Sequence, residues 1–390
     1  LGVVFTALLI HSTWELGGRR LLAPALVAVF PGLALEGVQG LETVFYAWLL
    51  TRALMGGRHW AVWSGLAALT RPEGYAFFGI LWLLRAGWTD RRSTLLFPLI
   101  TVPHLAFRVA YYGDIVPNTF HAKVGDPATL VGAAWERGLA YLGRNASDSV
   151  PTAVAFAAGL PVLVSRGLLK TDARLREATA MVAFVFVYVL AVGGDFKGTG
   201  RFLIPVLPCI AVLAQMGLVE AAKTRSVTVQ RGITGGLAAL AFIASIPGFQ
   251  AMRGFADYFA SDLQDRQLVG QTLKAKLPPD TLIAVHAAGI LPYYADVPTL
   301  DMWGLNDAHI ARAEVEDLGT GIAGHERHDY GYVLSRRPQI ILTEKDLVTP
   351  EPLVLGDPGV FGPEFADLYA PASMPLPDGR SMNAWILRRD

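Results

Sequence analysis

The sequence has little charge. Only 17% of its 390 residues are Asp, Glu, Lys or Arg, whereas an average soluble protein carries about 25%, and the formal net charge is zero. A single cysteine, Cys209, excludes a disulfide within the chain. The zero net charge argues against a nucleic-acid partner, because such proteins carry an excess of basic residues. We recognise no signal peptide and no internal repeat.

Apolar residues are abundant: they make up 53% of the chain, and its mean hydropathy is +0.39. This balance is typical of a polytopic α-helical membrane protein. Ten apolar runs lack persistent strand-like alternation, and we expect each to be a membrane helix, some of them short or broken around a cavity. The runs are Leu1–Ile10, Leu21–Leu33, Leu41–Met55, Trp60–Thr70, Gly74–Leu84, Leu95–Ala110, Ala153–Val164, Ala178–Val192, Phe202–Leu218 and Gly232–Ile246.

Basic residues are distributed unequally between alternate connections of these runs. One set of connections holds thirteen Lys and Arg residues and the other holds six, although the second set contains the longest connection. The positive-inside rule places the first set in the cytoplasm. We therefore predict a multi-pass protein of the bacterial plasma membrane, with the second set of connections and the C-terminal part outside the cytoplasm.

The character of the sequence changes near residue 250. We predict a helical membrane domain over residues 1–250 and an extracytoplasmic α/β domain over residues 251–390, which is a usual domain size. In the second domain, charges become frequent and the apolar runs are short. The pattern predicts strands at Thr281–Val285, Pro298–Met302, Gln339–Thr343 and Ala384–Arg388, and helices at Phe255–Leu277, Ala288–Ala295 and Tyr330–Ser335.

The segment Tyr111–Lys123 is the most unusual of the connections predicted to face outward. Its Asp114 could act as a general base, bind a metal or hold a sugar hydroxyl, or it could be an ordinary turn residue. Asn118, His121 and Lys123 form a polar cluster suited to hydroxyls and phosphate. We predict that the segment lines a substrate site at the membrane boundary.

A second outward connection, Gly193–Arg201, contains Asp195, Lys197 and Arg201 among four glycines. Glycine lets the backbone approach a ligand closely. Arginine offers a planar fork for phosphate oxygens, which favours a lipid-phosphate partner. The alternative is that the two cations only bind anionic lipid headgroups.

Four further charged residues lie in outward connections. Arg71 and Glu73 flank a proline and form either a salt-bridged turn or part of a site, because charges near a membrane need a partner or a cavity. Glu42, like Glu36, is a candidate, and it begins a helix where a carboxylate complements the dipole.

The C-terminal domain adds a set of His, Asn and acidic residues. Their density is compatible with a metal site, but the spacing matches no zinc signature, so turns and hydrogen bonding are favoured. We assign no metal ligand and leave a divalent cation open as a cofactor. Trp303 could stack on a sugar, with core packing as the alternative. The candidates for binding an acceptor are Asp301, Asn306, Asp307, His325 and Glu326.

Five motifs together resemble one family. YYGDIVPNTFHAK, GGDFKGTGRF, GLET, LTRPEG and DMWGLNDAHIAR, followed by GHE, are similar to the bacterial proteins related to mycobacterial terminal arabinofuranosyltransferases, over essentially all of the chain. Those proteins are membrane glycosyltransferases of the GT-C class. The resemblance implies inverting transfer of a sugar, such as arabinofuranose, from a polyprenyl-phosphate donor to an envelope glycan. It also implies that the C-terminal domain helps to bind that acceptor.

The catalytic base is missing from this pattern. GT-C enzymes typically place an aspartate in the first outward loop, and we interpret Leu1–Ile10 as the tail of the second helix. The expected aspartate would then lie upstream of residue 1. The resemblance therefore carries Asp114 and Asp195 over only as residues that line the cavity.

Two other classes of function remain open. A transporter or flippase for a lipid-linked sugar would place functional polar residues at mid-membrane depth and on both faces, whereas here they gather on one. A non-catalytic glycan-binding protein would need the membrane part only as an anchor, and ten helices exceed that need.

Overall fold

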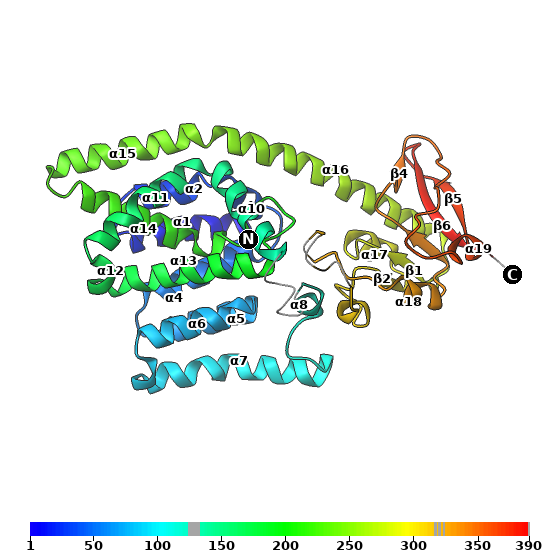
Figure 1. The fold of residues 1–390 in the computed structure, drawn as a ribbon, viewed down its shortest axis with the longest axis horizontal. Helices are drawn as coiled ribbons and strands as arrows, with labels where there is room; N and C mark the ends of the chain where they lie inside the picture. Colours follow the sequence, from blue (N-terminus) through cyan, green and yellow to red (C-terminus); the bar gives the residue numbers. More distant parts are fainter. Residues whose placement is uncertain (124–132, 316–317, 319–320, 323, 389–390) are drawn as a thin grey trace. The chain divides into compact units, whose positions relative to one another are not determined.

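The structure, a computed structural model, describes residues 1–123, 133–315, 318, 321–322 and 324–388. Contacts divide the chain into two compact units (Figure 1). The helical unit consists of Leu1–Ile115 and Ala133–Gly254. The α/β unit consists of Phe255–Asp390 together with the segment Val116–Gly132. The segment Val116–Gly132 therefore groups with the α/β unit, although it follows a long apolar helix of the helical unit in the sequence.

The predicted apolar runs are helical in the structure. Leu21–Leu33 is not one helix: it forms two short ones, and the second begins at Pro31, a residue favoured in the first turn of a helix. The helices of this unit are α1 (Gly2–Leu16), α2 (Leu22–Ala28), α3 (Pro31–Glu36), α4 (Thr43–Met55), α5 (Trp60–Thr70), α6 (Glu73–Leu84), α7 (Arg91–Tyr112), α10 (Ala133–Asp148), α11 (Val150–Ser165), α12 (Leu168–Thr171), α13 (Ala173–Val192), α14 (Leu207–Ala221) and α15 (Val227–Ala244), with short 3-10 turns at η1 (Gly87–Thr89) and η2 (Ile204–Val206).

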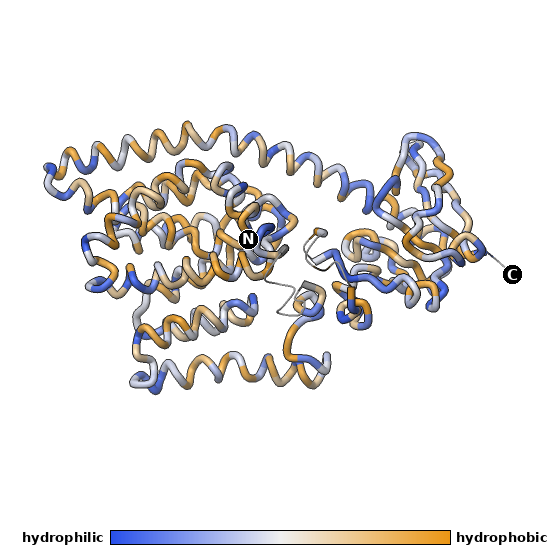
Figure 2. Tube along the Cα trace, in the orientation of Figure 1, coloured by the Kyte–Doolittle hydropathy of each residue, from blue (hydrophilic) through white to orange (hydrophobic). Residues whose placement is uncertain are grey.

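Four helices among the described residues are long and apolar enough to cross a membrane, which confirms a polytopic membrane protein. They are Arg91–Tyr112, Ala173–Val192, Ile204–Ala221 and Val227–Lys276. α10 and α11 add a fifth span if the pair is counted as one, although it bends by 105°. Figure 2 shows the apolar residues of these helices in orange, and the colour becomes mainly blue toward the end of α16 (Ile246–Lys276).

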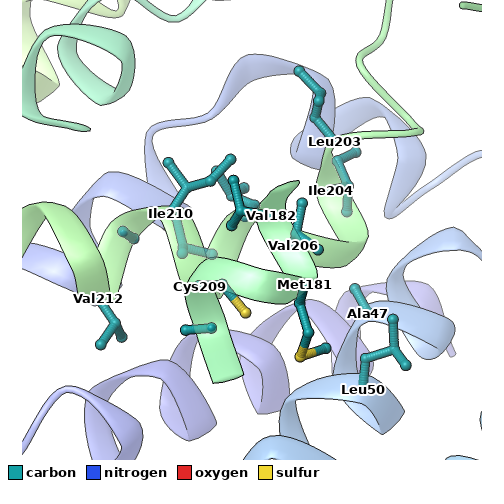
Figure 3. Close-up of a cluster of buried hydrophobic side chains, with 14 of the residues drawn as sticks. Ala47, Leu50, Met181, Val182, Leu203, Ile204, Val206, Cys209, Ile210 and Val212 are labelled. Atoms are coloured by element: carbon teal, nitrogen blue, oxygen red, sulfur yellow. The ribbon is translucent and has the colours of Figure 1, made fainter. Parts of the chain in front are cut away.

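Close helix packing holds the helical unit together. α11 and α14 meet at two glycines: a Cβ added to Gly159 would lie 2.6 Å from the Ala214 carbonyl oxygen, and one added to Gly217 would lie 2.1 Å from the Gly159 carbonyl oxygen. Small residues at such crossings are typical of membrane helices. Next to this crossing, η2 and the start of α14 bury a cluster of aliphatic side chains around Cys209 (Figure 3).

The α/β unit is built on a six-stranded sheet in the order β2-β1-β3-β6-β4, with β5 paired to β6. β1 (Ile283–Val285) pairs in parallel with β2 (Thr299–Asp301) and β3 (Ile340–Leu342), while β6 (Ser381–Leu387) is antiparallel to β3. β1 and β3 are buried throughout, as expected for parallel strands covered on both faces. The remaining elements are α8 (Asn118–Lys123), α16, α17 (Ile290–Ala295), η3 (Ile310–Arg312), α18 (Tyr330–Ser335), β4 (Val348–Thr349), α19 (Phe365–Leu368) and β5 (Tyr369–Pro375).

Candidate functional site

Charged side chains from three separate connections meet in the helical unit. The connections follow α3, α5 and α13, and their side chains form the ion pairs and hydrogen bonds given below. The sequence predicted each connection as a candidate, and the structure brings them together. We call this group the polar cluster; its members are Glu36, Glu42, Arg71, Glu73, Asp195, Lys197 and Arg201.

Asp195 and Arg201 form the tightest pair of the polar cluster. Arg201 Nε lies 2.5 Å from Asp195 Oδ2, and Arg201 Nη2 donates to Asp195 Oδ1 at 2.7 Å. The Asp195 side chain is only 2% exposed and the Arg201 side chain 17%. The guanidinium also lies 5.8 Å from the ring centroids of Phe196 and Phe202. The carboxylate and two aromatic rings therefore fix the direction of the arginine fork.

Arg71 occupies the middle of a second, looser group. Its Nε lies 3.6 Å from Glu73 Oε2 and 3.8 Å from Glu42 Oε1. Tyr188, from α13, donates its hydroxyl proton to Glu73 Oε1 at 2.9 Å. The structure therefore matches the predicted salt-bridged turn, with a tyrosine that the sequence reasoning did not place in the cluster.

Glu36 is the member of the cluster that connects the loops. It is 1% exposed, and it accepts hydrogen bonds from the hydroxyls of Thr43 and Thr199, each at 2.8 Å. These bonds tie the start of α4 and the connection after α13 to the end of α3. In the sequence, only its position in a polar motif indicated a role for Glu36, because its partner Thr199 lies far away in the chain.

Lys197 lies at the less buried side of the cluster. Its Nζ donates to Gln39 Oε1 at 3.4 Å, a long and weak hydrogen bond. Partial burial, and then the nearby Arg201 charge, lower the pKa of Lys197 below its ordinary value of 10.5. An anion beside Lys197 would relieve both effects, since it would compensate the lost hydration and offset the neighbouring positive charge.

The glycines of the 193–201 connection serve packing. Gly200 has a φ of +73°, and a Cβ there would lie 2.4 Å from Asn145 Oδ1. Gly194 has a φ of +76°, and a Cβ there would lie 2.6 Å from the Cβ of Tyr141. Both positions require glycine because the left-handed backbone passes directly against α10. The predicted close approach is thus made to a helix of the same unit.

An apolar cavity of about 400 Å³ adjoins this connection. It lies between α10, α11, α13 and α14, and Leu139, one of its lining residues, is 51% exposed, so the cavity reaches the surface of the unit. Asn145 lines the cavity and also contacts Gly200 of the 193–201 connection. Asn145 of α10 therefore links the apolar cavity to the connection that carries Asp195, Lys197 and Arg201. The other residues that line the cavity include Phe30, Gly143, Ala153, Phe156, Phe186, Leu203, Leu207 and Ile210.

The Tyr111–Lys123 candidates are divided between the two units. Asp114 follows α7 in the helical unit, whereas Asn118 and His121 lie on α8 in the α/β unit. Asn118 Oδ1 accepts from Arg312 at 3.3 Å. α8 ends at Lys123, whose side chain lies outside the described residues.

Two predicted candidates of the α/β unit, Asp301 and Asp307, accept hydrogen bonds from backbone amides. Asp301 is 3% exposed and accepts from the N–H groups of Trp303 at 2.9 Å and Asn306 at 2.8 Å. Burial raises the pKa of Asp301, and these amides act in the opposite direction. Asp307 accepts from the N–H groups of His309 at 2.9 Å and Ile310 at 3.0 Å. Such bonds are those of carboxylates that shape loops.

The other acceptor candidates also make contacts within the α/β unit. Glu326 Oε1 accepts from the Gly321 N–H at 2.7 Å. Asn306 Nδ2 lies 3.4 Å from the Ala288 carbonyl oxygen. The ring of His325 meets Trp303 edge-on at 4.5 Å, and the other ring neighbour of Trp303 is His286 at 4.9 Å. Within the described ranges, no group of three or more His, Cys, Asp or Glu side chains could hold a metal ion.

Comparison with a solved structure identifies the class of fold to which the chain belongs. A crystal structure of ArnT from Cupriavidus metallidurans in the apo state matches 98% of this chain and 82% of that chain, with a TM-score of 0.52 and 13% sequence identity. The chain therefore has a GT-C-type fold, and the predicted relation to the GT-C class is confirmed.

Two curated proteins resemble part of the chain in sequence. The terminal beta-(1->2)-arabinofuranosyltransferase of Corynebacterium glutamicum is 31% identical over 175 residues, which is 41% of this chain and 25% of the relative. The protein of the same name from Mycobacterium tuberculosis is 30% identical over 184 residues, which is 40% of this chain and 28% of the relative. The matches thus span about a quarter of the relatives' length. A family model for a domain of unknown function, DUF8728, matches residues 256–383.

Proposed function

We propose that the protein is a membrane glycosyltransferase that takes a sugar from a polyprenyl-phosphate donor and transfers it to an extracytoplasmic envelope glycan. The observation that carries the proposal is the proximity of the polar cluster to the apolar cavity: Asn145 lines the cavity and lies against Gly200 of the 193–201 connection. A polyprenyl-phosphate sugar is itself a long hydrocarbon joined to a charged group. The GT-C-type fold and the partial similarity to arabinofuranosyltransferases support the same class, with arabinofuranose as the favoured sugar.

The polar cluster would bind the phosphate of the donor. Arg201 presents a guanidinium whose direction is fixed by Asp195, and Lys197 adds a second cation beside it. As the glycosidic bond breaks, negative charge develops on the departing lipid phosphate. Cations that are already in place stabilise that charge without reorganisation, which is usually the largest catalytic contribution.

The apolar cavity would hold the part of the polyprenyl chain nearest the phosphate. Its aliphatic and aromatic lining removes hydrocarbon from contact with polar groups, and Asn145 stands where the lining meets the loop. The tail of such a donor comes from the bilayer rather than from water, so the cavity contributes van der Waals contact with the chain. The cavity therefore favours a lipid-linked donor over a free sugar phosphate.

The acceptor reacts through a hydroxyl, whose proton a carboxylate would remove. We leave this base unassigned, because Glu36, Glu73 and Asp195 are each engaged by other side chains of the helical unit. Inversion at the anomeric carbon, a divalent cation and the placement of the α/β unit outside the cytoplasm stay predictions from the sequence.

A pair of arginine variants tests the proposal. Arg201 and Arg85 both form tight pairs with a buried carboxylate; Arg85 Nη2 lies 2.6 Å from Glu177 Oε2. In the full-length protein in lipid nanodiscs, Arg201→Lys should lower transfer from a radiolabelled polyprenyl-phosphate sugar about 100-fold, since the bidentate fork is lost.

The matched control Arg85→Lys should lower thermal stability while leaving transfer per folded molecule unchanged. Equal transfer by the wild type and Arg201→Lys would overturn the assignment of the site. Donor movement across the membrane without transfer to any acceptor would instead support a flippase.

A further inference from the structure

The short helix α8 belongs to the α/β unit, although the helix that precedes it in the sequence, α7, belongs to the helical unit. α7 ends at Tyr112 and α8 begins at Asn118, yet the contacts of α8 place it in the α/β unit. There it packs against η3, and Ala122 on its buried side is 1% exposed. The chain thus passes between the two units at α16 and also where it leads into and out of the segment that contains α8.

Two arginines of the α/β unit hold α8 in this position. Arg312 Nη1 donates to Asn118 Oδ1 at 3.3 Å and to the Ala308 carbonyl oxygen at 3.0 Å. Arg327 Nε donates to the His121 carbonyl oxygen at 2.9 Å, and its Nη1 donates to the Ala313 carbonyl oxygen. Each guanidinium therefore joins α8 to the backbone on either side of η3.

The chemistry of these contacts suits a clamp. An arginine that donates to groups of two different segments joins those segments. Arg327 does this for His121 of α8 and for Ala313, which follows η3. A guanidinium with several donors in a fixed plane can bond two carbonyl groups at once, which the ammonium group of lysine does with less geometric precision.

We propose that Arg312 and Arg327 are positioning residues that clamp α8 to the α/β unit and so give this unit a second anchor beside α16. The proposal rests on the proposed function in one respect: the anchored unit is taken to present the glycan acceptor. With the clamp closed, only residues 113–117 separate the anchor from α7, and at 3.3–3.6 Å per residue they span at most about 18 Å. With the clamp open, the link that leaves α7 is no longer fixed at Asn118 and includes α8 itself.

A shorter tether raises the effective concentration of an acceptor held on the α/β unit. Opening the clamp should therefore weaken the use of acceptor and leave the donor site intact. It should raise the KM for acceptor with little change in kcat, because the chemical step at the donor is untouched. This signature separates a positioning role from a general loss of folding.

The experiment uses Arg312→Gln and Arg327→Gln, singly and together, in the full-length protein. The control is Arg336→Gln, since Arg336 donates to the Tyr332 hydroxyl at 2.6 Å in the same unit. Hydrogen–deuterium exchange of the backbone of residues 119–122 should become at least about 10-fold faster in the double variant and stay unchanged in the control. Arg327→Lys should give an intermediate rate.

Transfer kinetics provide the second measurement. The double variant should raise the KM for an oligosaccharide acceptor about 10-fold, with kcat and the KM for donor within about 2-fold of the wild type. Unchanged exchange of α8 would overturn the clamp, and this result does not depend on any transferase activity. Faster exchange with an unchanged KM for acceptor would overturn the positioning role.

Discussion

Carboxylates are used in two ways in this molecule. In the helical unit, Asp195 and Glu73 are paired with cationic or hydroxyl side chains. In the α/β unit, Asp301 is instead held by backbone N–H groups of its own loop, and Asp307 accepts from two backbone N–H groups and, at 3.4 Å, from the Tyr332 hydroxyl. A side-chain partner can turn toward a ligand, whereas a backbone amide that holds a loop cannot do so without deforming the loop. The comparison of Asp195 with Asp301 teaches that a promising motif alone does not distinguish a carboxylate with a side-chain partner from one that shapes a loop.

The largest expected effect comes from neutralising one aspartate in each unit. Asp195→Asn should lower transfer about 100-fold, because Arg201 loses the charge that directs its fork. Asp301→Asn should leave transfer per folded molecule within about 2-fold and lower stability by about 1–3 kcal/mol, since a charge-assisted bond to an amide is weakened. Transfer rates normalised to folded protein, with thermal unfolding alongside, check both. A comparable loss of transfer in Asp195→Asn and Asp301→Asn would contradict the different roles that we assign to the two aspartates.

Filling the apolar cavity should have the next largest effect. Gly143 lines the cavity, and nothing lies within 4 Å of a Cβ added there. Gly143→Leu should raise the KM for a long-chain donor about 10-fold, since the side chain occupies space needed by the hydrocarbon. Donors with chains of a few carbons should be unaffected. Gly235→Leu, on α15 with equally open surroundings, is the control, and an effect that ignores donor chain length would refute the cavity's role.

Removing the charge of Lys197 should have a smaller effect than changing Arg201. Lys197 acts as a single cation beside the phosphate rather than as a directed fork. Lys197→Gln should raise the KM for donor about 5-fold, a loss of about 1 kcal/mol of binding, and Lys197→Arg should retain most of the affinity. Steady-state kinetics at varied donor concentration measure this. An unchanged KM in Lys197→Gln would remove the residue from the site.

The smallest effect concerns acid stability and belongs to the α/β unit. His309 Nε2 lies 2.7 Å from Asp329 Oδ2, and this hydrogen bond is the largest cause that lowers the pKa of Asp329 below its ordinary value of 3.8. The stability that Asp329 contributes is therefore present above that value and is lost as the pH falls through the lowered pKa. His309→Ala, which removes the donor, should flatten the fall in unfolding free energy below about pH 4. If the unfolding free energy fell with decreasing pH at the same slope in the wild type and the variant, the prediction would be contradicted.

Much of the architecture could be predicted from the sequence. Most helices of the helical unit followed from the apolar runs, although α10 lies outside them, and β1, β2 and β3 followed from short buried runs of aliphatic residues. β5 was missed because Pro371 and Pro375 interrupt its strand pattern, although proline is tolerated at a sheet edge.

The candidate site was harder to predict, because its contacts are distant in the chain. The bond between Thr199 and Glu36 joins residues 163 positions apart, and only the fold brings them together. Asn118 was predicted beside the membrane site because it follows α7, whereas its contact with Arg312 assigns it to the other unit. Local sequence identifies polar residues but does not show which partners hold them.

The most direct test is the affinity of the full-length protein for a polyprenyl phosphate that carries no sugar. Native mass spectrometry of the wild type, Arg201→Lys and Arg85→Lys can measure it without an acceptor or turnover. The account predicts at least about 10-fold weaker binding for Arg201→Lys only, which corresponds to a loss of about 1.4 kcal/mol. Equal affinities in all three proteins would show that the polar cluster does not bind the donor phosphate, and the central claim would fail.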